Sequence, residues 1–70
     1  MRDVLLTTPW AELYKILKFE GLAASGGEAK AFIADGQVRV NGEVETRKRR
    51  KILAGDIIEF AGERINIQVE

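Results

Sequence analysis

The sequence contains no cysteine and no histidine among its 70 residues. Without cysteine the chain can form no disulfide, thiolate nucleophile or sulfur-ligated metal site. Without histidine it lacks the commonest general base and metal ligand. No apolar run approaches the roughly 18 residues that a membrane span needs, and the run from Val4 to Leu6 is too short for a secretory signal. We therefore expect a cytoplasmic protein that is not an enzyme and carries no cofactor or metal.

The composition is that of an ordinary globular protein, with 46% apolar and 31% charged residues. A chain of 70 residues makes one domain, and such a domain buries only about 60% of the surface that its unfolded chain exposes. The sequence shows no internal repeat, linker or low-complexity segment. We therefore treat residues 1–70 as a single domain of modest stability.

The charges are balanced in total but unevenly distributed. Eleven Lys and Arg residues match eleven Asp and Glu residues, yet five cations are consecutive, from Arg47 to Lys51. Because adjacent cations repel one another, we expect this run to contribute nothing to folding. A polyanion responds to the local field of such a patch more than to the net charge. The run is therefore a candidate nucleic-acid patch, and a merely solvated loop is the alternative.

A first helix is expected to begin at Thr8, as N-cap, with Pro9 in the first helical position. Apolar residues then follow at helical spacing, namely Trp10, Leu13, Tyr14 and Leu17, with Phe19 after them. At this spacing we expect the aromatic rings to lie in the core rather than to stack bases. Gly21 should end the helix in a left-handed conformation, with Leu22 packing back on Leu17.

A second helix is expected to begin at Ser25. Together with Glu28, three residues later, Ser25 is typical of a capping box, in which the hydroxyl accepts a backbone N–H and the carboxylate reaches back. The buried side should consist of Ala29, Phe32 and Ile33. Lys30 and Asp35 should face water, and Gly36 should end the helix by the same device as in the first.

The Asn-Gly pair at 41–42 is a strong signal for a β-hairpin. A two-residue loop would place Val40 opposite Glu43. A three-residue loop with a left-handed glycine would instead place Val38 opposite Val44. The apolar pattern favours the second register, because it pairs two apolar side chains.

Further strands are expected toward the end of the chain. They comprise Ile52-Leu53 before a Gly55-Asp56 turn, then Ile57 to Phe60, a turn at Ala61-Gly62-Glu63, and an alternating strand with Ile65, Ile67 and Val69. Val4 to Leu6 could add an edge strand. The sequence therefore predicts an α+β fold, with two N-terminal helices packed on a small, mainly antiparallel sheet.

Groups that could carry catalysis have simpler structural roles. Ser25 has no histidine to activate it and is explained as a helix cap. Glu43 and Glu45 stand beside the five cations, where solvated charge balance is expected. Gly26 and Gly27 complete no phosphate-binding fingerprint, but they leave the N–H groups of a helix N-terminus unshielded, and such termini attract phosphate.

The order of these motifs resembles the S4 RNA-binding domain, also called the αL RNA-binding motif. The resemblance rests on "LAASGGEAKAFIADGQVRVNGEV" and, after the basic run, "ILAGDIIEF", and it covers residues 12 to 60. The residues in register are Ser25, Glu28, Ala29, Ile33, Gly36, Val38, Val40, Asn41, Gly42, Gly55, Asp56 and Ile58. Among the members, the chain is most similar to small stand-alone bacterial proteins that consist of little besides this domain. The resemblance implies binding of structured RNA, such as ribosomal RNA, without catalysis.

Two cations of the family pattern are missing. Gly26 stands where many members have Arg, and Glu12, Leu13 and Tyr14 stand where they open the first helix with Arg-Leu-Asp. The RNA-contacting surface should therefore depend more on the basic run. Lys15 matches a cationic position of the first helix, and Lys18 is a weaker candidate.

We therefore expect a non-catalytic protein that binds structured RNA, with no membrane partner and as a monomer. The candidate RNA-binding residues are Arg47, Lys48, Arg49, Arg50, Lys51, Lys30, Arg39, Ser25, Gly26, Gly27 and Lys15. Lys and Arg contacts to phosphate position an RNA without reading its sequence, so recognition of shape is expected. Duplex DNA is less favoured, because no expected helix carries a row of base-reading side chains. The alternative is a protein-interaction adaptor that docks an acidic partner.

Overall fold

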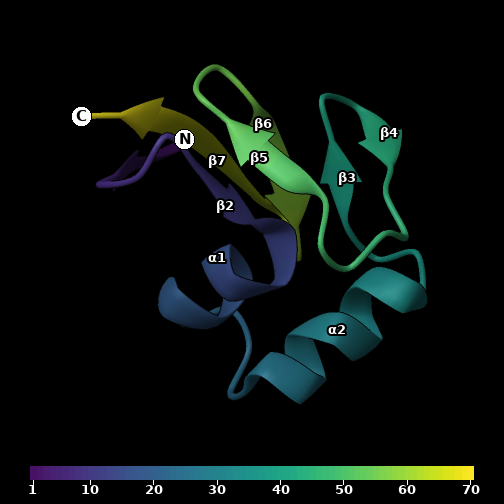
Figure 1. The fold of residues 1–70 in the computed structure, drawn as a ribbon. Coiled ribbons are helices and arrows are strands. Elements are labelled where there is room, and N and C mark those ends of the chain that lie inside the picture. The colour runs from purple at the N-terminus through teal and green to yellow at the C-terminus, as the bar shows by residue number, and fades with distance from the viewer.

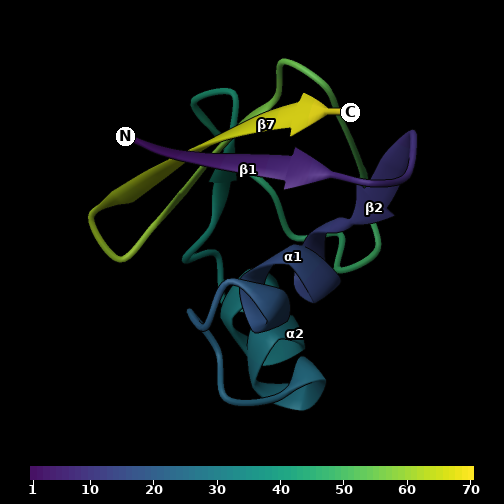
Figure 2. The ribbon, with the colours of Figure 1, turned by 90° about the vertical axis from the view of Figure 1, so that its left-hand side faces the viewer.

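A computed structural model describes all residues 1–70. The elements are, in chain order, β1 (Arg2–Leu6), β2 (Trp10–Glu12), α1 (Leu13–Phe19), α2 (Gly26–Ala34), β3 (Arg39–Val40), β4 (Glu43–Val44), β5 (Lys51–Leu53), β6 (Ile57–Phe60) and β7 (Glu63–Val69). Figure 1 shows the two helices side by side on one side of the strands, and Figure 2 shows the two chain ends at opposite ends of the parallel β1–β7 pair. Neither helix is long and apolar enough to span a membrane.

The strands form two sheets. The larger has the order β1-β7-β6-β3-β4, and the smaller pairs β2 with β5. Only β1 and β7 are parallel, as they appear side by side in Figure 2, and all other pairs are antiparallel. The predicted edge strand is thus β1, which begins two residues earlier than expected. The prediction of an α+β fold with two helices on a mainly antiparallel sheet is confirmed.

The core lies between the helices and the inner faces of both sheets. Its buried apolar residues are Leu13, Ile16, Leu17, Ala23, Ala29, Ile33, Val38, Val40, Ile52, Ile58, Phe60, Ile65 and Ile67. The strands bury alternate positions, as the period of a strand requires, so that Ile65 and Ile67 face the core while Arg64 and Gln68 face water. This arrangement leaves the outer face of the larger sheet mostly polar, with Leu5 and Val44 as exposed apolar exceptions.

The start of α1 differs from the sequence prediction, because the helix begins at Leu13 and not after Thr8. Residues 10–12 form β2 instead. The first N–H groups of the helix find their acceptors far along the chain: Leu13 N–H donates to the Arg50 carbonyl at 3.0 Å, and Tyr14 N–H to the Lys48 carbonyl at 3.1 Å. These bonds replace a side-chain cap, which Glu12 does not provide. A distant segment therefore determines where the helix starts.

The predicted ends of both helices are confirmed. Gly21 has φ +75° and Gly36 has φ +79°. Leu22 N–H donates to the Leu17 carbonyl at 3.0 Å, and Gln37 N–H donates to the Phe32 carbonyl at 3.1 Å. These are the six-to-one hydrogen bonds of Schellman motifs, in which a left-handed residue satisfies the last helical carbonyls.

The capping box at the start of α2 is also confirmed. The Ser25 hydroxyl accepts the Glu28 N–H at 3.1 Å. The Glu28 carboxylate reaches back to the Ala24 N–H at 2.9 Å.

The β3–β4 hairpin has the register that the apolar pattern disfavoured. Val40 lies opposite Glu43 and Arg39 opposite Val44, which leaves a two-residue turn with left-handed Asn41 (φ +54°) and Gly42 (φ +84°). The prediction was wrong because β4 is an edge strand whose Val44 side chain is 54% exposed. Pairing Val44 with the buried Val38 would bury little apolar surface, whereas a two-residue Asn-Gly turn matches the twist of the flanking strands.

Candidate nucleic-acid interface

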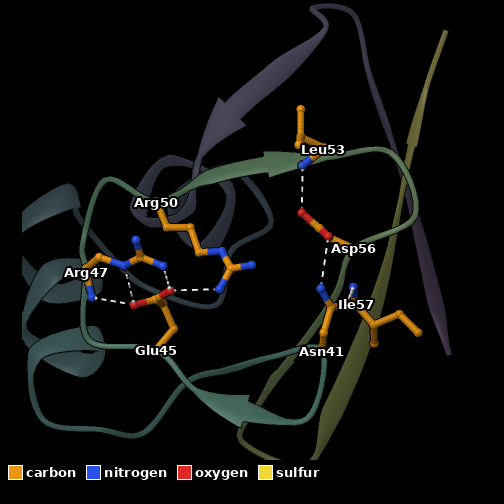
Figure 3. Close-up of polar contacts among 7 residues, drawn as sticks. All are labelled: Asn41, Glu45, Arg47, Arg50, Leu53, Asp56 and Ile57. Carbon is orange, nitrogen blue, oxygen red and sulfur yellow. Dashed lines mark hydrogen bonds and ion pairs between the residues drawn. The ribbon is translucent and has the colours of Figure 1, made fainter.

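The basic run is anchored by one buried carboxylate, that of Glu45, whose side chain is 8% exposed. Arg47 donates to it from its backbone N–H and Nε, at 2.9 and 3.1 Å, and from Nη2 at 2.9 Å. Arg50 donates through Nη1 at 2.9 Å. Figure 3 shows both guanidinium groups converging on this carboxylate. The expectations of a solvated Glu45 and of a run that adds nothing to folding are therefore wrong, because a buried carboxylate requires such partners.

These contacts shift the ionisation of both partners. The hydrogen bond from the Arg47 side chain is the main cause that lowers the pKa of Glu45 to about 2, assisted by the Arg47 N–H and by Arg50 and opposed by burial. The same hydrogen bond raises the pKa of the Arg47 guanidinium. Both groups are therefore charged at neutral pH.

The backbone of the run is fixed as well. Arg50 N–H donates to the Arg47 carbonyl at 3.3 Å and closes a turn. The Lys48 and Arg50 carbonyls cap α1, and Lys51 enters β5. The cations are thus presented on a fixed segment, which reduces the conformational entropy that binding would otherwise cost.

Tyr14 joins three segments of the site. Its ring centroid lies 4.6 Å from Lys30 Nζ, 5.3 Å from Arg49 Cζ and 5.9 Å from Lys15 Nζ. A Cβ atom on Gly26 would also contact this ring, at 3.5 Å. Cations at these distances are attracted by an aromatic face. The structure therefore brings four predicted site residues together around a half-buried tyrosine, and Lys30 is half-buried rather than fully in water.

Glu12 provides a second acidic anchor. Its Oε2 accepts a hydrogen bond from Arg49 Nη1 at 3.1 Å, and its Oε1 lies 3.4 Å from Lys15 Nζ. Desolvation would raise the pKa of this carboxyl, but the Arg49 hydrogen bond and the Lys15 charge together outweigh it and lower the pKa. The glutamate that departs from the family pattern thus positions two predicted site residues.

The basic side chains surround an open depression of about 500 Å³ lined by Arg47, Arg49, Arg50 and Lys51. The anchored arginines still reach water, because the side chains of Arg47 and Arg49 are 73% and 64% exposed. Lys48 is exposed and forms no ion pair. The depression is therefore positively charged and accessible.

Two aromatic residues that were expected in the core lie on the surface. Trp10 is 40% exposed and Phe19 is 74% exposed. Trp10 precedes the helix in β2, so helical spacing does not apply to it. Lys51 Nζ lies 4.8 Å from the centroid of its ring. Within α1 the buried residues are Leu13, Ile16 and Leu17, and Phe19 is not among them.

The N-terminus of α2 offers two free donors. The Ser25 hydroxyl is engaged by Glu28 N–H, but the N–H groups of Gly26 and Gly27 have no acceptor. Gly26 borders the Tyr14 ring, so these donors lie beside the cations around Tyr14. A phosphate is the kind of group that such a helix start attracts.

Arg39 lies apart from the other candidates. It is exposed on β3, on the face opposite to buried Val40, with Glu59 as its cross-strand neighbour. Glu59 in turn lies opposite Arg64 of β7. Arg39 therefore belongs to the polar outer face of the sheet, and no contact joins it to the basic run.

Three residues of the site were missed in the sequence. Glu45, Glu12 and Tyr14 each hold two or more of the cations. For Glu45 the signal was available, since a lone acid two residues before Arg47 can reach its guanidinium. For Glu12 and Tyr14 the partner Arg49 is far away in the chain, so no local pattern indicates the contact.

Comparison with known proteins places this geometry in a family. The S4 domain model matches residues 4–68. Over 59 residues the chain is 52% identical to YbcJ of Escherichia coli (strain K12), with 84% of each chain covered. It is 36% identical over 59 residues to a Bacillus subtilis (strain 168) protein named "Probable ribosome maturation protein RlbA", with 84% of this chain and 83% of that one covered.

Solved structures agree with this assignment. The solution structure of E. coli YbcJ, described as revealing an αL motif involved in RNA-binding, has a TM-score of 0.73 at 48% identity and covers 97% of this chain and 87% of its own. Ribosomal protein S4e of Thermoplasma acidophilum has a TM-score of 0.68 at 27% identity, over 83% of this chain but only 31% of its own. The match along nearly the whole length shows that the chain belongs to the S4 domain family.

Proposed function

We propose that the protein binds structured RNA without catalysing a reaction on it. The observation that carries the proposal is the positively charged depression, in which the cations are fixed by Glu45 and Glu12 yet remain open to water. Arg47, Arg49, Arg50 and Lys51 contact phosphates there, and Lys48 adds a contact from the same turn. Such contacts supply affinity and position, while the A-form backbone is recognised by shape.

The neighbouring groups extend this surface. Lys15 and Lys30 border the Tyr14 ring, and the N–H groups of Gly26 and Gly27 donate to a further phosphate beside them, with Ser25 holding the helix start in place. Arg39 contacts RNA only when a bound molecule reaches the outer face of the sheet.

Ribosomal RNA is the target class that we propose. The support comes from the relatives, one of which is named for ribosome maturation and another of which is a ribosomal protein. We further propose that the protein acts as a monomer in the cytoplasm, where such RNA is found.

Lys48 provides the cleanest test, because it forms no ion pair whose loss would disturb the fold. Lys48→Ala should lower the affinity for a short RNA hairpin and reduce the slope of log K against log salt by about 0.9. Arg64→Ala is the matched control, since it removes one exposed cation from the outer sheet face. Binding of a labelled hairpin at several salt concentrations, measured by fluorescence anisotropy, gives both slopes.

The proposal fails if the affinity does not depend on salt, or if both substitutions reduce the slope equally. Capture of an acidic protein that survives nuclease treatment, without binding to the hairpin, would instead identify the surface as a protein-docking site.

A further inference from the structure

The molecule has a second open depression next to the basic one. It has a volume of about 440 Å³ and is lined by Thr8, Trp10, Ala11, Glu12, Lys15 and Phe19. Its two aromatic side chains are among the large apolar residues that the fold leaves exposed. Exposed aromatic rings gathered in one hollow of a small domain indicate a binding surface rather than part of the core.

The two depressions share no lining residue, but two contacts join them. Lys51 lines the basic depression, and its Nζ lies 4.8 Å from the centroid of Trp10 in the second one. Glu12 lines the second depression and holds Arg49 of the first. Lys18 Nζ lies 5.8 Å from the centroid of Phe19. Each exposed ring thus has a cation beside it, and one of these cations belongs to the proposed phosphate-binding surface.

We propose that the second depression binds unpaired nucleobases of the RNA, stacked on Trp10 and Phe19. Lys18 and Lys51 contact the phosphates next to the stacked bases. The inference rests on the proposed function and specifies its substrate class, which is a duplex that continues into a single strand. Aromatic rings beside a basic groove suit a single strand because every base has a face that can stack.

The charges favour RNA over a second copy of the chain or an apolar partner. Lys15, Lys18 and Lys51 surround the two rings, so two copies facing each other here would bring like charges together. A nucleic-acid strand supplies both flat apolar faces and the anions that these cations need. Glu12, neutralised by Lys15 and Arg49, remains at the rim as an acceptor for a base amino group.

The test uses a short blunt RNA hairpin and the same hairpin extended by a few unpaired adenosines at its 5′ or 3′ end. Fluorescence anisotropy gives the affinity of the full chain and of Trp10→Ala, Trp10→Phe, Phe19→Ala and Lys48→Ala. The unaltered protein should prefer one extended hairpin by about 5-fold or more for each stacked base. Trp10→Ala and Phe19→Ala should reduce this preference and leave the affinity for the blunt hairpin unchanged.

The other variants separate this inference from the proposed function. Lys48→Ala should weaken binding to all hairpins but retain the preference for the extended hairpin over the blunt one. Trp10→Phe should retain part of this preference. Because the chain has a single tryptophan, stacking should also quench its fluorescence with the extended hairpin only.

Equal affinity of the unaltered protein for all hairpins, or a preference that survives both alanine substitutions, overturns this inference alone. Absence of salt-dependent binding to every hairpin overturns the proposed function and this inference with it. A dimer that forms without RNA and dissociates on Phe19→Ala, measured by sedimentation, assigns the depression to a second copy and also overturns it.

Discussion

Glu45 is the one charged residue that the fold buries, and it holds two of the five cations in the basic run. Its two oxygens hold Arg47 and Arg50, whose own side chains remain partly exposed. A carboxylate in this position organises cations that would otherwise repel one another. The candidate interface therefore depends on an acidic residue as much as on its basic ones.

Replacing this carboxylate should destabilise the protein. In Glu45→Gln the hydrogen bonds from both arginines become uncharged or are lost, and we expect the free energy of unfolding to fall by about 1–3 kcal/mol. Glu43→Gln is the matched control, because Glu43 is exposed and unpaired, and it should change the free energy by less than about 0.5 kcal/mol. Urea unfolding followed by circular dichroism measures both, and equal effects would contradict the role of Glu45.

The contribution of Glu45 should also depend on pH. The pKa of this carboxyl is about 2 in the folded protein, while an unfolded glutamate has a pKa of about 4.3. A lowered pKa means that the stabilisation is complete above the unfolded pKa and is lost as the pH falls toward the folded one. The difference in unfolding free energy between the unaltered protein and Glu45→Gln should therefore shrink between about pH 5 and pH 2. A difference that stays constant over this range would show that the charge of Glu45 contributes nothing.

At the scale of elements, two turns of the same kind are built from different residues. The β3–β4 turn has left-handed Asn41 and Gly42, and the β6–β7 turn has left-handed Ala61 (φ +52°) and Gly62. Asn41 Nδ2 donates to Asp56 Oδ1 at 3.0 Å, and Asn41 Oδ1 accepts the Ile57 N–H at 2.9 Å (Figure 3). Ala61 has no side-chain polar group and bears the cost of its conformation without compensation.

Substitution by glycine should therefore change the free energy of unfolding in opposite directions at the two turns. Ala61→Gly should raise the free energy of unfolding by up to about 1 kcal/mol, because relief of the left-handed alanine exceeds the added freedom of the unfolded chain. Asn41→Gly should lower it by about 1–2 kcal/mol, because it removes two hydrogen bonds while φ stays allowed. Thermal unfolding of the two variants provides the comparison, and a shift in the same direction for both would refute it.

Elements whose ends are fixed by local contacts could be predicted from the sequence, and those fixed by distant contacts could not. Ser25 with Glu28, and Gly21 and Gly36, act within a few residues of their partners, so the start of α2 and both helix ends were readable. The start of α1 depends on carbonyls more than thirty residues away, and the favourable Thr8-Pro9 pair was misleading. The hairpin register was misjudged because apolar pairing was given more weight than the turn.

At the scale of the whole molecule, the basic run was recognisable as a charged patch because five adjacent cations need no structural context. The contacts that anchor this patch could not be predicted from the sequence, since Tyr14, Glu12 and Arg49 come together only in the folded chain. The exposure of Trp10 could not be read from spacing, because Trp10 lies in a short strand where a helix was expected, whereas Phe19 lies in the expected helix but off its buried face. Sequence thus indicated the basic patch, and structure added its anchors and its aromatic border.

The smaller sheet should unfold together with the rest of the domain. Trp10 is the single tryptophan and lies in β2, whose partner β5 contributes the fully buried Ile52 to the core. We therefore expect Trp10 fluorescence and far-ultraviolet circular dichroism to give the same urea midpoint, as in a two-state transition. An earlier fluorescence midpoint would show that the smaller sheet and the basic run open before the core.

The two loop carbonyls that cap α1 limit how this surface can be redesigned. The side chain at position 48 can be exchanged freely to retarget binding, because Lys48 forms no ion pair, whereas Arg47, Arg49 and Arg50 are held by Glu45 and Glu12. An inserted residue between 47 and 50 would displace the Lys48 and Arg50 carbonyls from the helix start and leave its N–H groups unsatisfied. In a redesign, the length of this segment must therefore stay fixed, while an unpaired side chain within it can be replaced.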